Sequence, residues 1–250
     1  MTYCLGILVD DGLVMIADTR TNAGLDNVAT YRKLHVFEQP GEKFMAVATA
    51  GNLAMSQSVL THASEGMENP ATGERETLLD QPSMFRAAQF LGTAVRTARR
   101  FQDATLEQSQ PGLFDMSMLL GGQVRGGRLR LFLIYNAGNF IEATEDTPYL
   151  QIGEHKYGKP ILDRSVSRET RLEDALKLGL ISMDSTIRSN LGVGLPIDLL
   201  TIRRDAVETE LTYRIDEKEP YFHDLRERWS NALTEAHRAI PAPPYGQEGK

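Results

Sequence analysis

The chain places a threonine at position 2, directly before an apolar run that is typical of a β-strand. A threonine hydroxyl is a weak nucleophile and needs a base. If Met1 is removed, Thr2 gains a free α-amino group, and the pKa of such an amine, about 7.7–8.0, suits general-base work at neutral pH. Thr2 could then supply both the nucleophile and the base of an acyl transfer. Taken alone, however, a threonine at this position is almost always incidental.

Three further residues could complete such a site. Lys33 leads into a later strand, and a lysine beside the amine would keep it neutral by like-charge repulsion and favour oxyanion formation. Asp18 would keep that lysine charged and oriented. Gly51 ends a strand just before a helix, where free N–H groups that can bind an oxyanion collect. Singly, Asp18 is more often an ion-pair partner, Lys33 a solvated surface charge and Gly51 a tight turn. The hypothesis therefore depends on their combination.

The position of the aspartate depends on the first hairpin. The sequence DDG at residues 10–12 favours a three-residue loop with its glycine in the left-handed position. Val9 would then pair with Leu13, and Thr2 and Asp18 would be diagonal neighbours on one face, roughly 7–8 Å apart. A two-residue turn would instead put Thr2 and Asp18 on opposite faces.

Hydrophobic periodicity predicts groups of strands separated by helices. Strands are expected at residues 3–9, 13–18, 34–38, 43–50, 115–123, 128–136, 139–144, 149–153, 197–204 and 208–215, and helices at 52–64, 83–107, 170–187 and after Pro220. Residues 65–82 have the composition of a loop. This order indicates an α+β layered domain. We expect a single domain over residues 1–240, with the helix at about 220–239 as an addition and residues 241–250 as a flexible Pro- and Gly-rich tail.

The composition argues against several classes of protein. The chain has 250 residues, 41% of them hydrophobic and 24% charged, as in an ordinary globular protein. A net charge of −7 with scattered basic residues argues against a nucleic-acid partner. A single cysteine favours a reducing compartment, and no signal peptide or membrane span is found. We therefore expect a cytoplasmic protein without a membrane partner.

Other chemistries have weaker support. Cys4 and His35 could suggest a thiol nucleophile, but Cys4 lies in the middle of a predicted strand, where a small thiol usually fills the core. The five histidines lack the spacing of metal ligands, and no Gly-rich phosphate loop occurs. We expect no metal, no cofactor and no ATP bound by the chain itself.

The order of motifs resembles the β-subunits of proteasomes and the related bacterial ATP-dependent protease HslV. Within that superfamily the chain most closely resembles the Anbu group of proteasome-like peptidases, whose chains typically start MTYC. The segment DTRTNAG (Asp18–Gly24) is similar to the family's D-[ST]-R-x-x-x-G, and the sixteen-residue spacing from Thr2 to Asp18 agrees with the family's nucleophile and aspartate. TAG at residues 49–51 and LLGGQ at residues 119–123 also resemble family segments.

This resemblance implies an N-terminal nucleophile hydrolase fold, a four-layer αββα sandwich with two antiparallel sheets. It implies a threonine peptidase whose catalytic residues are Thr2, Asp18, Lys33 and Gly51. It places Arg20, Asn22 and Thr49 at substrate-binding positions. The implied substrate is a peptide or unfolded protein, and the implied assembly is a homo-oligomer, either a ring or an open spiral. The family context also allows an ATPase partner.

Two segments depart from the family pattern. IGEHKYG puts Glu154 at the position of the family's supporting serine, and RSNLGVG puts Ser189 or Asn190 near its supporting aspartate. Both changes affect residues that help position the amine, so activity is expected to be weak or restricted. Two alternatives stay open: a small-amide hydrolase on the same fold, and a non-catalytic assembly subunit that retains Met1.

Overall fold

The computed structural model describes residues 1–22, 28–69, 72–105 and 115–245. The elements are β1 (Tyr3–Leu8), β2 (Gly12–Asp18), β3 (Arg20–Asn22), β4 (Val28–Thr30), β5 (Leu34–Gln39), β6 (Lys43–Gly51), α1 (Leu53–Glu65), β7 (Met67–Glu68), β8 (Arg75–Glu76), α2 (Met84–Thr105), β9 (Met116–Val124), β10 (Arg130–Ile134), β11 (Phe140–Glu142), β12 (Tyr149–Gly153), α3 (Lys159–Ser165), α4 (Leu172–Ser189), β13 (Ile197–Arg203), β14 (Leu211–Ile215) and α5 (Pro220–Ala239). They form two compact units, Met1–Glu217 and Lys218–Lys250.

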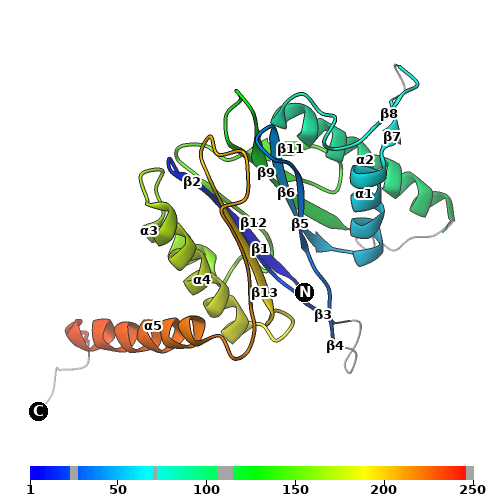
Figure 1. Cartoon of the computed structure of the whole chain (residues 1–250). Helices are drawn as coiled ribbons and strands as arrows, with labels where there is room; N and C mark the ends of the chain where they lie inside the picture. Colours follow the sequence, from blue (N-terminus) through cyan, green and yellow to red (C-terminus); the bar gives the residue numbers. More distant parts are fainter. Residues whose placement is uncertain (23–27, 70–71, 106–114, 246–250) are drawn as a thin grey trace, which may run out of the picture. The chain divides into compact units, whose positions relative to one another are not determined.

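Two five-stranded antiparallel sheets form the centre of the first unit. Their strand orders are β12-β1-β2-β13-β14 and β11-β10-β9-β6-β5. Helices α3 and α4 cover the outer face of the first sheet, and α1 and α2 cover the outer face of the second (Figure 1). This arrangement is the four-layer αββα sandwich that the family resemblance implied.

The core between the two sheets contains both large and very small residues. Leu13 and Met15 of the first sheet meet Phe44 and Leu131 of the second, and all four are fully buried. Gly121 lets the sheets approach, because a Cβ atom there would lie 2.6 Å from Leu13 Cδ2. Strands β1 and β2 are buried along their whole length, since each lies between the other sheet and a helical layer.

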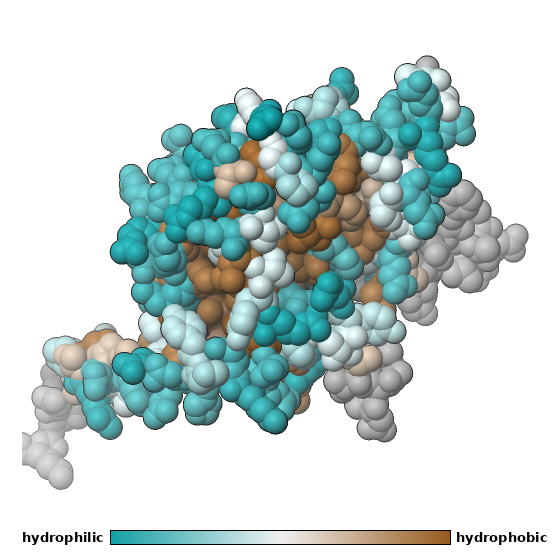
Figure 2. Space-filling view, in the orientation of Figure 1, coloured by the Kyte–Doolittle hydropathy of each residue, from teal (hydrophilic) through white to brown (hydrophobic). Residues whose placement is uncertain are grey.

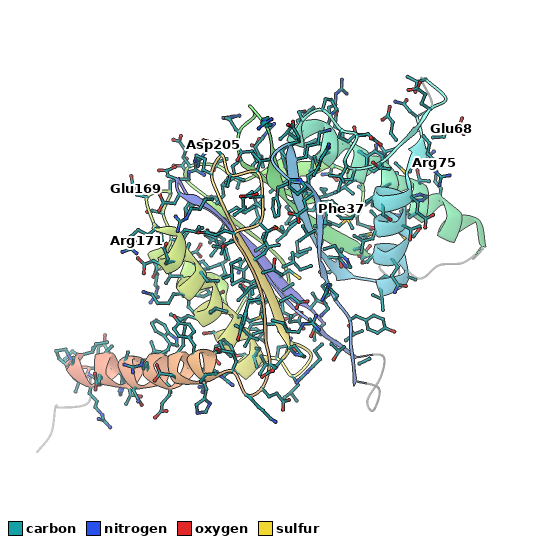
Figure 3. All side chains as sticks on the ribbon, viewed as in Figure 1. Phe37, Glu68, Arg75, Glu169, Arg171 and Asp205 are labelled. Carbon is teal, nitrogen blue, oxygen red and sulfur yellow. The ribbon has the colours of Figure 1, made fainter. Side chains whose placement is uncertain are left out.

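A second core lies under α1 and α2. The apolar stripe predicted for the long helix is buried in it, at Met84, Ala88, Leu91, Val95 and Ala98. Phe37 of β5 also packs against this core (Figure 3). Helical spacing therefore identified the correct face of α2, because a stripe at that spacing is buried only on one side of a helix.

Several short elements were not predicted from the sequence. Strands β3, β4, β7 and β8 have two or three residues each, and α3 has seven. Figure 3 shows the β7–β8 pair, in which Glu68 lies opposite Arg75. Such lengths are too short to produce a measurable periodicity. The expected end of the long helix at residues 106–107 and the tail residues 246–250 lie outside the described residues.

The predicted first hairpin was wrong by one residue. Leu8 pairs with Leu13, and Val9 and Gly12 exchange backbone hydrogen bonds of 2.9 and 3.3 Å across a two-residue turn. Gly12 does not take the left-handed conformation; it is a strand residue, and a Cβ atom there would collide with the carbonyl oxygen of Ile202. Its small size allows β13 to approach β2. The glycine at position 12 was therefore informative. It is required by the close approach of β13 to β2, and not by a left-handed turn.

Helix α5 begins at Pro220, close to where the sequence predicted the last helix. Pro220 occupies the first turn, where its missing N–H is not needed. The side chain of Glu219 caps the helix by accepting from Phe222 N. Across the part of the chain that the structure describes, none of the helices is both long enough and apolar enough to span a membrane.

We predict that Phe132→Ala destabilises the first unit by about 3–5 kcal/mol, because a fully enclosed ring is replaced by a cavity. Phe132 is 1% exposed and stacks edge-on against Phe140. Ile141→Ala on the neighbouring strand is the matched control: Ile141 is 46% exposed, so the expected change is within about 0.5 kcal/mol. Urea unfolding followed by circular dichroism measures both, and similar losses for the two variants would contradict the packing described.

Candidate active site

Thr2 is held at the end of β1 by main-chain contacts. Its carbonyl oxygen accepts a 2.7 Å hydrogen bond from Glu154 N, and the residue is only 8% exposed. Gly153 lies against the same carbonyl, with φ +80, and a Cβ atom at this position would collide with it. Met1 is 67% exposed. The position of Thr2 is therefore fixed by backbone on β12, and Met1 projects outward from it.

Asp18 ends β2 with no exposure to solvent. Its Oδ1 accepts from Tyr3 N at 3.0 Å and from Lys33 Nζ at 2.8 Å, and its Oδ2 accepts from Gly194 N at 3.4 Å. The observed hairpin register explains the first of these bonds, because it puts Tyr3 opposite Asp18. The aspartate is thus tied to the residue that follows Thr2 and is not a same-face diagonal neighbour of Thr2, as the three-residue loop had predicted.

Lys33 is buried beside this carboxylate. It is 5% exposed, and its Nζ also donates to the carbonyl oxygen of Arg20 at 2.5 Å. Burial raises the pKa of the Asp18 carboxyl, and the charge of Lys33 together with the hydrogen bonds to both oxygens opposes that rise. The result is a buried ion pair whose oxygens have three N–H donors, the condition under which such a pair is tolerated in a core.

Gly51 ends β6 with φ +103, a conformation that side chains rarely adopt. Asn52 N donates to Asp115 O on the β9 side, whereas Thr49 N donates to Lys33 O on the β5 side. At Gly51 the chain therefore leaves the regular strand conformation, between the hydrogen bonds of Thr49 and Asn52.

The expected substrate-binding residues lie around this pair. Thr49 is buried next to Lys33 on β6. Arg20 begins β3, and its Nη1 donates to Leu191 O at 3.0 Å. Asn22 ends the same strand, but its side chain lies outside the described residues. The structure therefore brings Arg20 and Thr49 to the Lys33 region.

The three expected supporting residues take different positions. Glu154 reaches Thr2 through its backbone N–H. Asn190 caps α4; its Oδ1 accepts from Gly192 N at 2.8 Å, and its Nδ2 lies 3.5 Å from Met1 Sδ. Ser189 is an exposed residue at the end of α4. Asn190 is therefore next to Met1 at the N-terminus, whereas Ser189 is exposed to solvent at the end of α4.

Sequence reasoning missed Gly194 and Tyr3. Gly194 donates to Asp18 from a segment 176 residues away in the sequence. A side chain there would collide with the Arg20 guanidinium, with Arg20 Nη2 only 2.6 Å from a Cβ atom. The G-V-G sequence at residues 192–194 was a signal that backbone comes close to something, but it does not say to what.

The structure does not bring Cys4 and His35 together as a thiol site. The Cys4 thiol lies 3.6 Å from Thr49 O, and burial raises its pKa. The His35 ring lies 3.1 Å from Arg32 O and faces a groove. Cys4 and His35 thus have separate partners. In the described ranges, no group of three or more His, Cys, Asp or Glu residues is placed to hold a metal ion.

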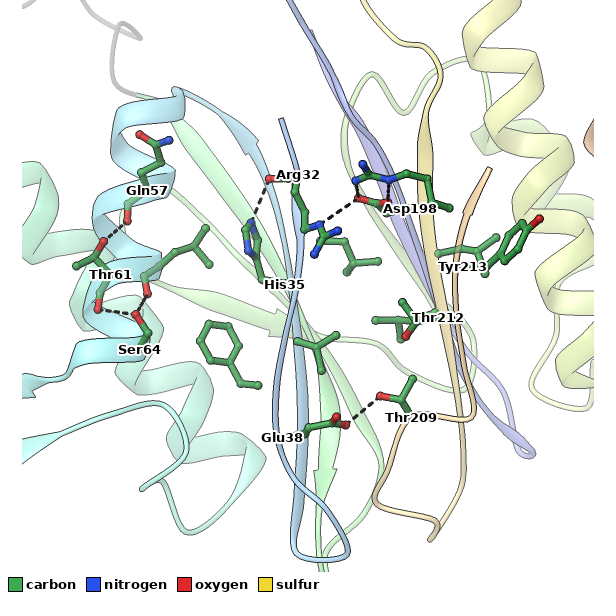
Figure 4. Close-up of a pocket in the computed structure, with 17 residues that line it drawn as sticks. Arg32, His35, Glu38, Gln57, Thr61, Ser64, Asp198, Thr209, Thr212 and Tyr213 are labelled. Carbon is green, nitrogen blue, oxygen red and sulfur yellow. Dashed lines mark hydrogen bonds and ion pairs between the residues drawn. The ribbon is translucent and has the colours of Figure 1, made fainter. Parts of the chain in front are cut away.

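A groove of about 970 Å³ adjoins the site. It is lined by residues of β5 and α1 on one side and of β13 and β14 on the other (Figure 4). Arg32 and Leu34, the neighbours of Lys33 in sequence, are among its lining residues. Figure 2 shows apolar side chains gathered in the middle of this face, with polar groups around them. Thr2, Asp18, Lys33 and Gly51 do not line the groove itself.

The fold is similar to that of proteasome β-subunits. Among curated proteins, the chain is 21% identical to proteasome subunit beta 1 of Pyrobaculum arsenaticum over 220 residues, which cover 85% of this chain and 95% of that protein. No protein-family model matches the chain. The fold class is thus that of the N-terminal nucleophile hydrolases of proteasome type.

Comparison with solved structures identifies the family within that class. Anbu (ancestral beta-subunit) from Yersinia bercovieri is 45% identical, with 98% of this chain and 100% of that chain covered and a TM-score of 0.88. The structure described as a helical assembly of the Anbu complex from Pseudomonas aeruginosa is 43% identical, with 98% and 99% covered and a TM-score of 0.89. The chain belongs to the Anbu family.

We predict that Lys33→Met costs about 3–5 kcal/mol of stability at pH 7, because it leaves the Asp18 carboxylate buried without its cation. Burial raises the pKa of Asp18 and Lys33 opposes that rise, so the pKa of Asp18 is higher still in the variant. The penalty is therefore full above this pKa, shrinks as the pH falls through it and the carboxyl takes up a proton, and is gone below the ordinary pKa of an unfolded Asp. Urea unfolding of wild type and variant at pH 7 and at successively lower pH measures the difference.

Lys159→Met is the matched control, because Lys159 forms an exposed ion pair with Asp163 at 2.6 Å. Its expected cost is about 0–1 kcal/mol. A Lys33→Met penalty that stays constant with pH would show that the loss comes from packing and not from the unpaired carboxylate.

Proposed function

We propose that this protein is a threonine-type N-terminal nucleophile peptidase, with Thr2, Asp18, Lys33 and Gly51 as its catalytic residues. The observation that carries the proposal is the buried ion pair of Asp18 and Lys33, bonded to the N–H of the residue next to Thr2. If Thr2 carries a free amine, this buried pair can control the protonation state of that amine. Membership of the Anbu family, with its likeness to proteasome β-subunits, supports the same chemistry.

In this proposal the chemistry begins once Met1 has been hydrolysed from Thr2. The Thr2 amine accepts the proton of Thr2 Oγ, and Oγ forms a bond to the substrate carbonyl carbon. The N–H of Gly51 donates to the resulting oxyanion. The protonated amine then gives its proton to the leaving nitrogen as the peptide bond breaks. Water attacks the remaining ester by the same route and restores Thr2.

Lys33 and Asp18 act on the state of that amine. The positive charge of Lys33 disfavours a second positive charge nearby, so it keeps the amine of Thr2 neutral and able to accept a proton. The Asp18 carboxylate holds the Lys33 ammonium charged and in place through the 2.8 Å bond. Removing either partner would change the charge balance at the amine.

The proposed substrate is a peptide or an unfolded protein in extended form. Arg20, Asn22 and Thr49 are proposed to bind it, because β3 begins at Arg20, whose carbonyl oxygen accepts from Lys33 Nζ, and Thr49 N on β6 donates to Lys33 O. The adjoining groove offers room for further residues of the substrate. We also propose a homo-oligomeric assembly, on the basis of the helical assembly named for the Pseudomonas aeruginosa relative.

A second candidate keeps the fold but takes a small amide as substrate. The observation that favours it is the segment around Asn190 and Gly192. Asn190 Nδ2 contacts Met1 Sδ, and a Cβ atom on Gly192 would lie 2.6 Å from Met1 Cβ. Once Met1 is removed, the space that its side chain occupies against this segment becomes free, and it is of a size to take a small substrate group.

We predict that Thr2→Ala abolishes hydrolysis of fluorogenic peptides, by on the order of 10³-fold or more, because the nucleophile is removed. Thr2→Ser keeps a hydroxyl and an amine on one residue, so it should retain measurable activity. Intact-mass spectrometry of each protein must first show that Met1 is absent.

Equal rates for wild type and Thr2→Ala would refute the peptidase proposal. Turnover of small amides without turnover of peptides would favour the second candidate. Retention of Met1 in the protein purified from cells would instead indicate a non-catalytic assembly subunit, since the free amine would then belong to the wrong residue.

A further inference from the structure

Tyr3 contacts the candidate site through its backbone and the helical layer through its side chain. Its N–H donates to Asp18, whereas its ring is fully buried and its hydroxyl lies 2.7 Å from Ser182 Oγ on α4. Gln151 of β12 donates to the same hydroxyl. A Cβ atom on Gly158 would lie 2.6 Å from this hydroxyl, so there is no spare space around it.

The hydroxyl is held in one protonation state. Burial raises the pKa of the Tyr3 hydroxyl further above its ordinary value, so the group is a neutral O–H at neutral pH. Because the hydroxyl oxygen accepts from Gln151, its hydrogen is available for Ser182 Oγ. Tyr3 therefore fixes three elements to one another: β1, β12 and α4.

Hydrogen bonds between successive residues, which share residues but not atoms, connect Ser182 to the segment that bonds Asp18. Thr186 Oγ1 donates to Ser182 O at 3.0 Å, and Asn190 N donates to Thr186 O at 2.9 Å. Val193 N donates to Asn190 O at 3.1 Å, and the next residue, Gly194, donates to Asp18. The series starts at the Tyr3 side chain and closes at the carboxylate that accepts from Tyr3 N.

We propose that Tyr3 is a positioning residue, whose hydroxyl sets the distance between α4 and β1 and thereby holds Gly194 N–H on Asp18. The inference rests on the proposed function for its consequence in catalysis, but the contact between α4 and Asp18 can be tested without it. The Gly194–Asp18 bond, at 3.4 Å, is the longest of the three that Asp18 accepts. It is therefore the bond most easily lost when α4 moves.

Removing the Tyr3 hydroxyl should act through that bond. Ser182 and Gln151 would each lose a buried partner, and α4 would shift to recover hydrogen bonds. Asp18 would then lose the Gly194 donor, and its pKa would rise further. The titratable groups that face Asp18 are Lys33, which precedes β5, and Cys4 on β1. Neither changes in the variant, so a change in the titration of Asp18 reports on the donor.

The test compares Tyr3→Phe and Ser182→Ala with Tyr149→Phe. Tyr149 is a matched control, because it is also a mostly buried tyrosine on this sheet, with its hydroxyl bonded to Asp163 and not to the site. Carbon-13 NMR of labelled aspartate measures the pKa of Asp18 in each protein. The rate of modification of Thr2 by a peptide epoxyketone, followed by intact mass, measures how well the amine and hydroxyl are placed. Thermal unfolding measures stability.

We expect Tyr3→Phe and Ser182→Ala to raise the pKa of Asp18 and to slow modification by about 10-fold or more. Tyr149→Phe should cost less stability, because its partners Asp163 and Lys159 are exposed to water, and should leave both readouts unchanged. An unchanged Asp18 titration in Tyr3→Phe would overturn the inference. A wild-type protein that does not react with the epoxyketone would count against the proposed function, while the titration would still decide the role of Tyr3.

Discussion

The burial of a charged pair, Asp18 and Lys33, is the constraint on which the rest of the site depends. A carboxylate without exposure to solvent is stable only if its oxygens are paired and hydrogen-bonded. Here the partners come from three separate places: Lys33 before β5, Tyr3 on β1 and Gly194 before β13. The αββα sandwich matters for the candidate site because it brings these three segments together.

Glycines allow the backbone of these segments to come this close. Gly153 lies against the carbonyl of Thr2, Gly194 lies against the Arg20 guanidinium, and Gly51 turns the end of β6 with φ +103. At each of these three positions a Cβ atom would collide with a neighbouring group, so a glycine is required. The site is therefore organised largely by main-chain groups, whose positions are less mobile than those of long side chains. The ion pair itself is made by the side chains of Asp18 and Lys33.

Some elements were predictable because their signals are local. The stripe of α2 was read correctly, because a helix of 22 residues repeats its pattern many times. Strands β3 and β4, with three residues each, and the short α3 have no such repeat. The first hairpin is the informative error. DDG favoured a left-handed glycine, whereas Gly12 is needed for the approach of Ile202, which lies 190 residues later in the sequence.

The sequence by itself determined the class of fold and nominated the residues of the candidate site. Thr2, Asp18, Lys33 and Gly51 could be selected from their chemistry and spacing, and the motif order indicated the Anbu family that the solved structures confirm. Only the tertiary structure decided how Asp18 is held: opposite Tyr3, bonded to Gly194 and linked through α4 to the Tyr3 hydroxyl. The physical reason is distance along the chain. Periodicity and spacing record interactions within a few residues, whereas each of these contacts depends on packing between segments that the sequence keeps far apart.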